Sequence, residues 1–305
     1  MNCAVVDIGT NSTRLLLAVV EDGRVGDVLE RRTEITRLGA GVDADGRLND
    51  EAMGRVYSVL DDYGKLIERH GADRAVAVLT SAVRDAANGE EFARTVRERW
   101  GLEPHVLSGD EEARLTYLGA TSERDPSDRT PTVVIDIGGG STEFVIGTGG
   151  EMTFHVSNQA GVVRQTERHL HSDPPTTEEC EALARDVRSI LSQGVPEKWR
   201  RAVGHAIAVA GTATSMASIA QELEPYDPDK VEGYIVTEEQ CREIRDRLAG
   251  LTLDQRRLVR GLHPDRAPTI VAGTIILLET LALLGLHEFE VSEHDILRGA
   301  AIGLE

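Results

Sequence analysis

Cysteine is scarce in this chain of 305 residues, which holds only Cys3, Cys180 and Cys241, far apart and odd in number. Such spacing provides neither a disulfide framework nor the close ligand pairs of a zinc site. The N-terminus also lacks the basic stretch and the apolar segment of a secretory signal, since it runs almost at once into "CAVVDIG". We therefore expect a reducing, cytoplasmic compartment.

Long apolar segments and positive charge are lacking too. The longest apolar run, "IVAGTIILLETLALLGL" from Ile270, has 17 residues and contains Glu279, which favours a buried helix over a membrane span. The net charge of −19 argues against a nucleic-acid binder, which needs a basic contact face. A small anionic ligand remains compatible with this charge, because backbone N–H groups, a few arginines and a divalent metal can hold phosphate.

Several familiar motifs are absent. Neither a Walker A sequence nor GxGxxG occurs, so P-loop and dinucleotide chemistry are not indicated. No nucleophile–His–Asp constellation can be assigned. The pair His294-Asp295 stands without the further ligands of a metal-dependent hydrolase, and a structural role is the more economical interpretation.

What the sequence does contain is a repeat. "DIGTNSTRLLLAVVEDG" begins at Asp7 and "DIGGGSTEFVIGTGG" begins at Asp136, an offset of 136 − 7 = 129 residues. Each copy lies in a predicted meander of three strands, at 2–32 and at 132–157, and α/β segments follow both. The polar stretch at 122–131 is typical of a linker. The pattern predicts two similar α/β domains that face each other across a cleft.

Helix signals are clear at several places. Capping boxes are predicted at Ser108 with Glu111, at Thr176 with Glu179 and at Thr237 with Gln240. The expected helices cover 50–70, 88–100, 109–120, 160–170, 176–194, a segment from Thr212, a segment from Thr237, and 266–284; further strands are expected at 75–80, at "PHVLS", at "AIAVAG" and at "EFEVS".

The repeated turns combine residue types that suit phosphate. Gly138, Gly139 and Gly140 permit close approach of the backbone to a ligand, and Ser12 and Ser141 add hydroxyl donors. An aspartate at the end of each strand would repel phosphate directly, and it makes sense if a divalent cation lies between. A plain glycine turn explains one copy as well, but two matching copies favour a phosphate site.

A third candidate is "VAGTATSMAS". Here Gly211 is predicted to end a strand and Thr212 to open a helix, whose N-terminal N–H groups could accept an anion. Alone this signal is weak, because Gly and Thr also simply begin helices.

Taken together, "VVDIGTNSTRLLLA", "TSAVRDA", "LSGDEEARLTYLGA", "VIDIGGGSTEF", "GVVRQTE", "VAGTATSMAS", "RAPTIVAGTIIL" and "VSEHDILRGA" resemble the exopolyphosphatase and guanosine pentaphosphate phosphohydrolase family. The resemblance runs from residue 4 to about residue 303. It implies two ribonuclease-H-like domains of the actin, sugar-kinase and heat-shock-chaperone superfold around a central cleft. We expect the domains at 1–122 and 123–305, with the last helix, at about 295–305, packing back on the first domain.

The resemblance also implies roles for residues. Glu112 would be the general base and Arg84 would meet the terminal phosphoryl group. The metal, Mg²⁺ or Mn²⁺, would be held by Asp136, Glu143 and Asp7, and the phosphates would be held by Asn11, Ser12, Gly138, Gly139, Gly140, Ser141, Gly211 and Thr212. Arg14, Arg164 and Arg298 are weaker candidates, for which a surface role is equally compatible.

Helical spacing places Glu112 on one face with Thr116 and Gly119, whose small side chains could leave room for a substrate. Glu111 is better explained as a cap and a complement to the helix dipole.

The expected substrate is inorganic polyphosphate. Guanosine penta- or tetraphosphate is an alternative ligand, and a non-catalytic polyphosphate or alarmone sensor is an alternative function. No membrane or nucleic-acid partner is expected, and a homodimer is left open. Longer members of the family carry extra C-terminal helical domains, whereas this sequence resembles the short two-domain form, for which processive action on long polymers is doubtful.

Overall fold

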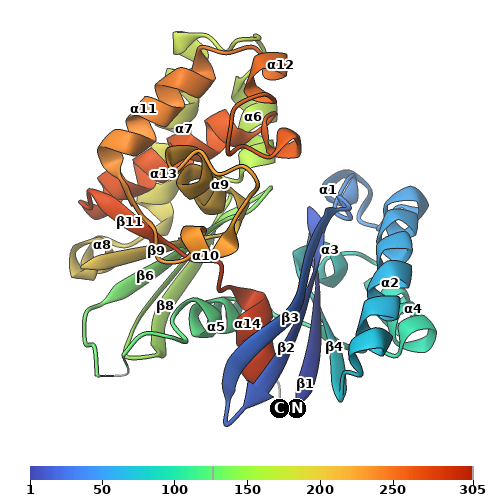
Figure 1. The fold of residues 1–305 in the computed structure, drawn as a ribbon. Helices are drawn as coiled ribbons and strands as arrows, with labels where there is room; N and C mark the ends of the chain where they lie inside the picture. Colours follow the sequence, from blue (N-terminus) through green and yellow to red (C-terminus); the bar gives the residue numbers. More distant parts are fainter. Residues whose placement is uncertain (126, 304–305) are drawn as a thin grey trace. The chain divides into compact units, whose positions relative to one another are not determined.

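The computed structural model describes residues 1–125 and 127–303, which divide into two compact units (Figure 1). Unit 1 comprises Met1–Ser122 and the described part of Asp295–Glu305, and unit 2 comprises Glu123–His294. The chain therefore passes from one unit to the other twice, after Ser122 and after His294. Each unit is described by itself below.

Unit 1 is built on a five-stranded sheet in the order β3-β2-β1-β4-β5. Its strands are β1 Asn2–Ile8, β2 Ser12–Glu21, β3 Arg24–Ile35, β4 Arg74–Leu79 and β5 Glu103–Val106. The first three pair antiparallel as a meander, and β4 and β5 extend the sheet in parallel from β1.

Helices cover both faces of this sheet, and β1 is buried on both sides. Alternate residues of a strand point to opposite faces. Ala4, Val6 and Ile8 pack on the side of α2 and α4, whereas Cys3 and Val5 pack on the side of α5 and α14. The helices of unit 1 are α1 Val42–Asp45, α2 Asp50–His70, α3 Ser81–Arg84, α4 Gly89–Trp100, α5 Gly109–Ala120 and α14 Ile296–Gly303.

Unit 2 repeats this architecture with one extra edge strand, in the order β10-β11-β9-β6-β7-β8. The strands are β6 Thr132–Ile137, β7 Thr142–Thr148, β8 Glu151–Asn158, β9 His205–Val209, β10 Ile235–Thr237 and β11 Glu288–Val291. The meander β6–β7–β8 and the parallel neighbours β9 and β11 correspond to β1–β2–β3, β4 and β5. This correspondence confirms the predicted α/β class with two similar sheets.

The helices of unit 2 enclose a core in which α13 is buried almost all round. They are α6 Val162–His169, α7 Thr177–Gly194, α8 Glu197–Ala202, α9 Ala210–Ala220, α10 Pro228–Val231, α11 Glu238–Ala249, α12 Leu253–Arg256, the 3₁₀ turn Pro264–Arg266 and α13 Ile270–Leu284. In residues 1–125 and 127–303 no helix combines the length and apolarity needed to cross a membrane.

Local sequence signals account for many of these boundaries. All three predicted capping boxes are present, at Ser108, Thr176 and Thr237. The apolar helix is the exception: it was predicted from residue 266 but begins at Ile270. Pro268 has no backbone N–H for the helical ladder, and the preceding residues form a 3₁₀ turn instead.

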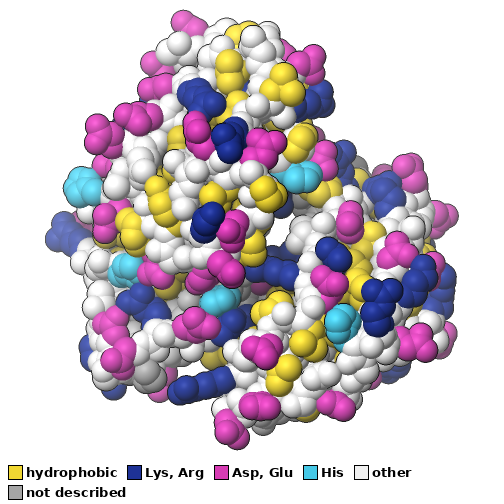
Figure 2. All heavy atoms as spheres, in the orientation of Figure 1, with side chains coloured by type: hydrophobic (Ala, Val, Ile, Leu, Met, Phe, Trp, Pro, Cys, Tyr) yellow, Lys and Arg dark blue, Asp and Glu magenta, His cyan; other side chains and the backbone are white. Residues whose placement is uncertain are grey.

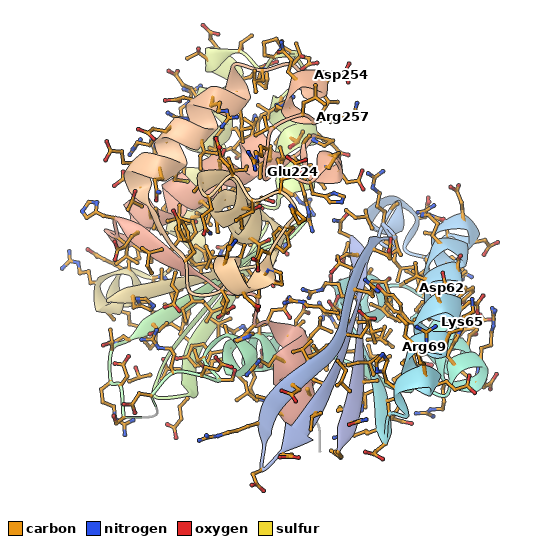
Figure 3. All side chains as sticks on the ribbon, in the orientation of Figure 1. Asp62, Lys65, Arg69, Glu224, Asp254 and Arg257 are labelled. Atoms are coloured by element: carbon orange, nitrogen blue, oxygen red, sulfur yellow. The ribbon has the colours of Figure 1, made fainter. Side chains whose placement is uncertain are left out.

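Charged side chains are spread over the molecular surface. Figure 2 shows acidic and basic side chains interspersed on the face in view. Exposed pairs such as Asp62–Lys65 on α2 and Asp254–Arg257 beside α12 illustrate the pattern (Figure 3). Water and salt screen exposed pairs of this kind, and ordering two long side chains costs entropy, so the surface charge explains little of the fold.

Candidate active-site residues in each unit

The two repeated turns have the same backbone geometry. In unit 1 the N–H of Gly9 donates to the carbonyl oxygen of Ser12 over 2.9 Å, and in unit 2 the N–H of Gly138 donates to Ser141 over 2.9 Å. The flanking strand registers also correspond, because Ile8 lies opposite Thr13 and Ile137 opposite Thr142. The repeat in the sequence is thus a repeat in structure, in the hydrogen bond that closes the turn and in the register of its strands.

In both units a neighbouring segment holds the carbonyl groups of the turn. Residues 36–39 donate N–H groups to the carbonyls of Thr10 and Asn11, and residues 161–164 donate to those of Gly138, Gly139 and Gly140. Within the described chain, the N–H groups of Thr10, Asn11, Gly139 and Gly140 donate to no backbone carbonyl. Anchored carbonyls with N–H groups left for a ligand are what a phosphate-binding turn requires.

The backbone of the unit 2 turn packs against Gly161. A Cβ added to it would come within 2.3 Å of the carbonyl carbon of Gly140 and 2.4 Å of that of Gly139. Backbone therefore packs directly on backbone at the start of α6. Arg164, one turn into the same helix, donates from Nε to the Gly140 carbonyl over 3.0 Å, so this candidate braces the turn.

The charges beside the two turns differ. Asp7 lies opposite Arg14 in the β1–β2 register, and the equivalent pair in β6–β7 is Asp136 opposite Glu143. Each pair shares one face of its sheet, because directly opposed residues of antiparallel strands have neighbouring side chains. Unit 1 therefore places unlike charges together where unit 2 places two carboxylates.

In the unit 1 pair Asp7 is buried and Arg14 is partly buried. Only 4% of Asp7 is exposed, and its Oδ2 accepts from Nε and Nη2 of Arg14 over 2.9 and 2.6 Å. Burial raises the pKa of the Asp7 carboxyl above its ordinary value, although Arg14 opposes this change. The second oxygen, Oδ1, is buried and has no hydrogen-bond partner among the described residues.

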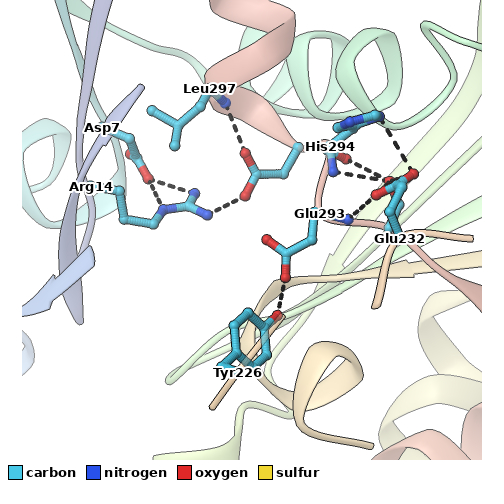
Figure 4. A network of polar contacts seen from close by, with 9 residues as sticks. Asp7, Arg14, Tyr226, Glu232, Glu293, His294 and Leu297 are labelled. Atoms are coloured by element: carbon cyan, nitrogen blue, oxygen red, sulfur yellow. Dashed lines mark hydrogen bonds and ion pairs between the residues drawn. The ribbon is translucent and has the colours of Figure 1, made fainter. Parts of the chain in front are cut away.

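Arg14 also reaches the last helix of unit 1. Its Nη1 bonds the carboxylate of Asp295, which in turn accepts from the N–H of Leu297 over 3.0 Å at the start of α14 (Figure 4). Burial opposes the ionisation of Asp295, but the charges of Arg14 and Arg31 outweigh it and the pKa of this carboxyl is lowered. Asp295 thus has the structural role expected from the sequence.

Asp136 and Glu143 fit a divalent cation better than Asp7 does. Both are half-buried, and Ser157 donates from Oγ to Oε1 of Glu143 over 2.8 Å. Like charges directly opposite each other destabilise a sheet unless something compensates them. In residues 1–125 and 127–303 no three His, Cys, Asp or Glu side chains are placed so that they could hold a metal ion together, so the described protein offers a pair of carboxylates here. Mg²⁺ commonly uses one or two carboxylates together with water and substrate phosphates.

Glu112 and Arg84, for which the resemblance implied catalytic roles, lie close together in unit 1. Nη1 of Arg84 lies 3.3 Å from Oε2 of Glu112 and donates to the carbonyl of Leu107 over 2.8 Å. Their side chains are 31% and 28% exposed, so both can meet a ligand. Glu111 instead accepts from the N–H and hydroxyl of Ser108, which lowers the pKa of its carboxyl and occupies it as a cap.

The structure adds Thr10 and Ser81 to the candidates. Their hydroxyl oxygens lie 2.9 Å apart, so the unit 1 turn is linked to the start of the short helix α3 that carries Arg84. The sequence contained a signal for this link, since "TSAVRDA" was among the motifs of the resemblance. The sequence does not single out the hydroxyl of Ser81, because no local signal predicts the short helix α3.

The third candidate loop is organised differently from the prediction. The helix α9 begins at Ala210, which has a positive φ of 64°, so Gly211 lies inside the helix and does not end a strand. A Cβ on Gly211 would lie 2.2 Å from the guanidinium carbon of Arg266, and a Cβ on Gly273 would lie 2.7 Å from the methyl of Thr212. Arg266 therefore packs over the first turn of α9, a candidate that the motif "RAPTIV" contained and that sequence reasoning missed.

Two further expectations are corrected. Gly119 does not leave room for a substrate, because a Cβ there would come within 1.9 Å of the Asp295 carbonyl oxygen, and Thr116 on the same face is buried. Arg298 is not on the surface: it is 7% exposed and donates to the Ser122 hydroxyl and the Val25 carbonyl over 2.9 and 3.2 Å. Its role in unit 1 is structural.

Known proteins agree with this picture over nearly the whole chain. The Ppx/GppA phosphatase family matches residues 16–300. Exopolyphosphatase 2 of Mycobacterium tuberculosis is 39% identical over 313 residues, which cover 99% of this chain and 98% of that protein.

Solved structures are similar too. An Aquifex aeolicus member of the Ppx/GppA family is 33% identical with a TM-score of 0.86, covering 100% of this chain and 97% of its own. An exopolyphosphatase from Cytophaga hutchinsonii is 25% identical with a TM-score of 0.86, covering 98% and 96%.

These likenesses confirm the predicted fold class, two ribonuclease-H-like domains of the actin-like superfold. The central cleft concerns how the units face each other and stays a prediction. A family match over most of the chain, joined to a relative of nearly equal length at 39% identity, places this protein in the Ppx/GppA phosphatase family.

Proposed function

We propose that this protein is an exopolyphosphatase that hydrolyses the terminal phosphoanhydride of inorganic polyphosphate and releases phosphate. The observation that carries the proposal is the carboxylate of Glu112, which is accessible, lies 3.3 Å from Arg84 and takes no part in the cap that occupies Glu111. The similarity to Exopolyphosphatase 2 of Mycobacterium tuberculosis supports the choice of substrate.

The residues divide the chemistry between them. Glu112 accepts the proton of the attacking water, and Arg84 stabilises charge on the transferred phosphoryl group. General-base catalysis of this kind contributes ~10²–10⁴-fold in rate. The turns at Asn11–Ser12 and 138–141 bind phosphate oxygens through their N–H and hydroxyl groups, and the first turn of α9, at Gly211 and Thr212, holds a phosphate further along the polymer.

Mg²⁺, with Mn²⁺ as a substitute, is the proposed cofactor. When bound, it would neutralise charge on the phosphoanhydride. Asp136 and Glu143 would hold it, because they form the one strand-paired set of carboxylates beside either repeated turn. Asp7, whose Oδ2 is bound by Arg14, is a less suitable ligand than the sequence suggested.

Guanosine pentaphosphate is the second substrate to test, because it also ends in a phosphoanhydride and the same residues can serve it. A sensor without catalysis would have no use for the accessible carboxylate of Glu112. We further propose a cytoplasmic location, and a homodimer remains compatible with the proposal. No nucleic-acid or membrane partner is needed.

The deciding experiment compares Glu112→Gln with Glu111→Gln. Phosphate release is measured from polyphosphates of defined length and from guanosine pentaphosphate, with Mg²⁺ and with excess chelator. Glu112→Gln should lower turnover by ~10²-fold or more while polyphosphate binding survives, because the amide keeps the shape of the side chain and loses its basicity. Chelator should abolish release from every substrate.

Glu111→Gln is the matched control on the adjacent residue. It should retain turnover and lose ~1 kcal/mol or less of stability, because only the cap is weakened. The pKa of Glu111 is lowered by its bonds to Ser108, so this loss should be present at neutral pH and should fade as the pH drops through that lowered pKa. Equal loss of turnover in both variants would point to helix damage, and an active Glu112→Gln would place the base elsewhere.

A further inference from the structure

Unit 1 contains a polar link that the proposed reaction does not itself use. Arg14 joins two buried carboxylates, Asp7 at the phosphate turn and Asp295 at the start of α14. The two aspartates are 4% and 3% exposed. A buried ion triad of this kind is a weak source of net stability, because desolvation of the charges offsets much of their attraction. Net stability therefore does not explain why Arg14 is held between two buried carboxylates.

The strand pattern explains why the triad forms on this side of the sheet. Cys3 and Val5 point toward α5 and α14, and alternation continues this face to Asp7. On β2, Leu16 and Ala18 belong to the same face, which continues back to Arg14. Asp7 and Arg14, which flank the phosphate turn on β1 and β2, therefore lie on the sheet face that packs against α14.

The same end of α14 is packed against the helix that carries Glu112. A Cβ on Gly119 would lie 1.9 Å from the carbonyl oxygen of Asp295, and a Cβ on Gly299 would lie 1.8 Å from that of Leu115. The two helices therefore cross backbone against backbone at Leu115 and Gly119, about one and two turns beyond Glu112. Such a contact has little freedom to slide, since close-packed backbones cannot absorb a shift by side-chain rotation.

We infer that Arg14 and Asp295 are positioning residues that set the phosphate turn and Glu112 in register with each other. Asp295 makes both connections: its carboxylate reaches Arg14 and thereby Asp7, and its carbonyl rests on Gly119 of α5. The alignment of a base with the group it acts on is worth much in rate, because a displacement of about 1 Å can cost ~10²-fold. This inference rests on the proposed function.

Two mild substitutions test the link without leaving a charge stranded. Arg14→Lys keeps the positive charge but loses the planar fork that reaches both carboxylates. Asp295→Asn keeps an oxygen for the N–H of Leu297 and loses the ion pair with Arg14. The matched control is Arg32→Gln on β3, an exposed arginine whose partner is Glu30.

The kinetic readout is phosphate release from short polyphosphate. Each variant should lower kcat by ~10–10²-fold and change KM by less than about threefold, because the substrate contacts remain while the alignment is lost. The double variant should be no slower than the worse single variant within about twofold, since both substitutions break one link. Arg32→Gln should match the wild type.

A readout without substrate is amide hydrogen exchange. Both variants should accelerate exchange in residues 8–14 and in residues 109–120 together, while residues 50–70 of α2 stay unchanged. Faster exchange confined to α14, or an unchanged kcat with a lowered melting temperature, would overturn the inference and leave the triad a purely structural feature. A wild-type protein that releases no phosphate would contradict the proposed function alone, because the exchange result stands without it.

Discussion

The two copies of the repeated hairpin share a backbone and differ in charge. Asp7 faces Arg14 in unit 1, and Asp136 faces Glu143 in unit 2. The unit 1 copy supplies its own cation, Arg14, which pairs with Asp7 and also with Asp295 of the same unit. The other contains two half-buried carboxylates, an arrangement that an external cation would complete. A single change of residue at equivalent positions thus separates a hairpin that is complete in itself from one suited to bind an ion.

The largest expected effect on this contrast comes from removal of one carboxylate of unit 2. Glu143→Gln should lower turnover by ~10²-fold or more, because the proposed cation loses half of its protein ligands. The same variant should melt like the wild type in chelator, because the amide keeps the shape of the side chain and can still accept from Ser157. Phosphate release measures the turnover, and thermal melting in chelator measures the stability. A variant with the same Mg²⁺ requirement as the wild type would show that Glu143 does not hold the cation.

A smaller effect is expected from the segments that hold the two turns. Gly161→Ala should cost ~1–3 kcal/mol and lower phosphate affinity, because its Cβ meets the backbone of Gly139 and Gly140. Gly39→Ala is the unit 1 counterpart, where the clash at 2.3 Å is with the methyl of Thr10. A side chain yields more readily than backbone, so this variant should lose less stability. Denaturant unfolding ranks the two, and the opposite order would show that the unit 1 turn is the more rigid.

The smallest effect concerns a feature that the copies share. Thr13 and Thr142 are fully buried; the first hydroxyl lies 2.9 Å from that of Thr36, and the second donates to the Ala160 carbonyl over 2.7 Å. Each Thr→Val substitution should cost ~1 kcal/mol, the net value of one buried hydrogen bond. Chemical denaturation of both variants measures this, and a difference above about 1 kcal/mol between them would show that the two hairpins are not energetically equivalent here.

Local features of this molecule were predictable from the sequence. The capping boxes at Ser108, Thr176 and Thr237 formed as expected, because a cap depends only on residues three apart. The strands on either side of the repeated turns followed for the same reason: apolar alternation and turn residues are local signals.

Particular contacts between residues far apart in the sequence were not predictable, although the resemblance implied that the last helix packs back on the first domain. Asp295 lies 281 residues from Arg14, so no local pattern could pair them. Gly119 was interpreted as open space because its neighbour, α14, comes from the far end of the chain. Arg266 packs over Gly211 in the same way, across α9 and the 3₁₀ turn, and the edge strand β10 pairs with β11 far along the sequence.

The double passage of the chain between the units has a consequence for synthesis on the ribosome. The face of the first sheet formed by Cys3, Val5 and Leu16 is covered by α5 and α14, and the residues of α14 are translated after the whole of unit 2. Unit 1 is therefore begun first and completed last, and this apolar face lacks the part of its cover that α14 supplies while residues 123–294 are translated. A nascent chain that lacks α14 therefore has every residue of unit 2 but still lacks the last element of unit 1.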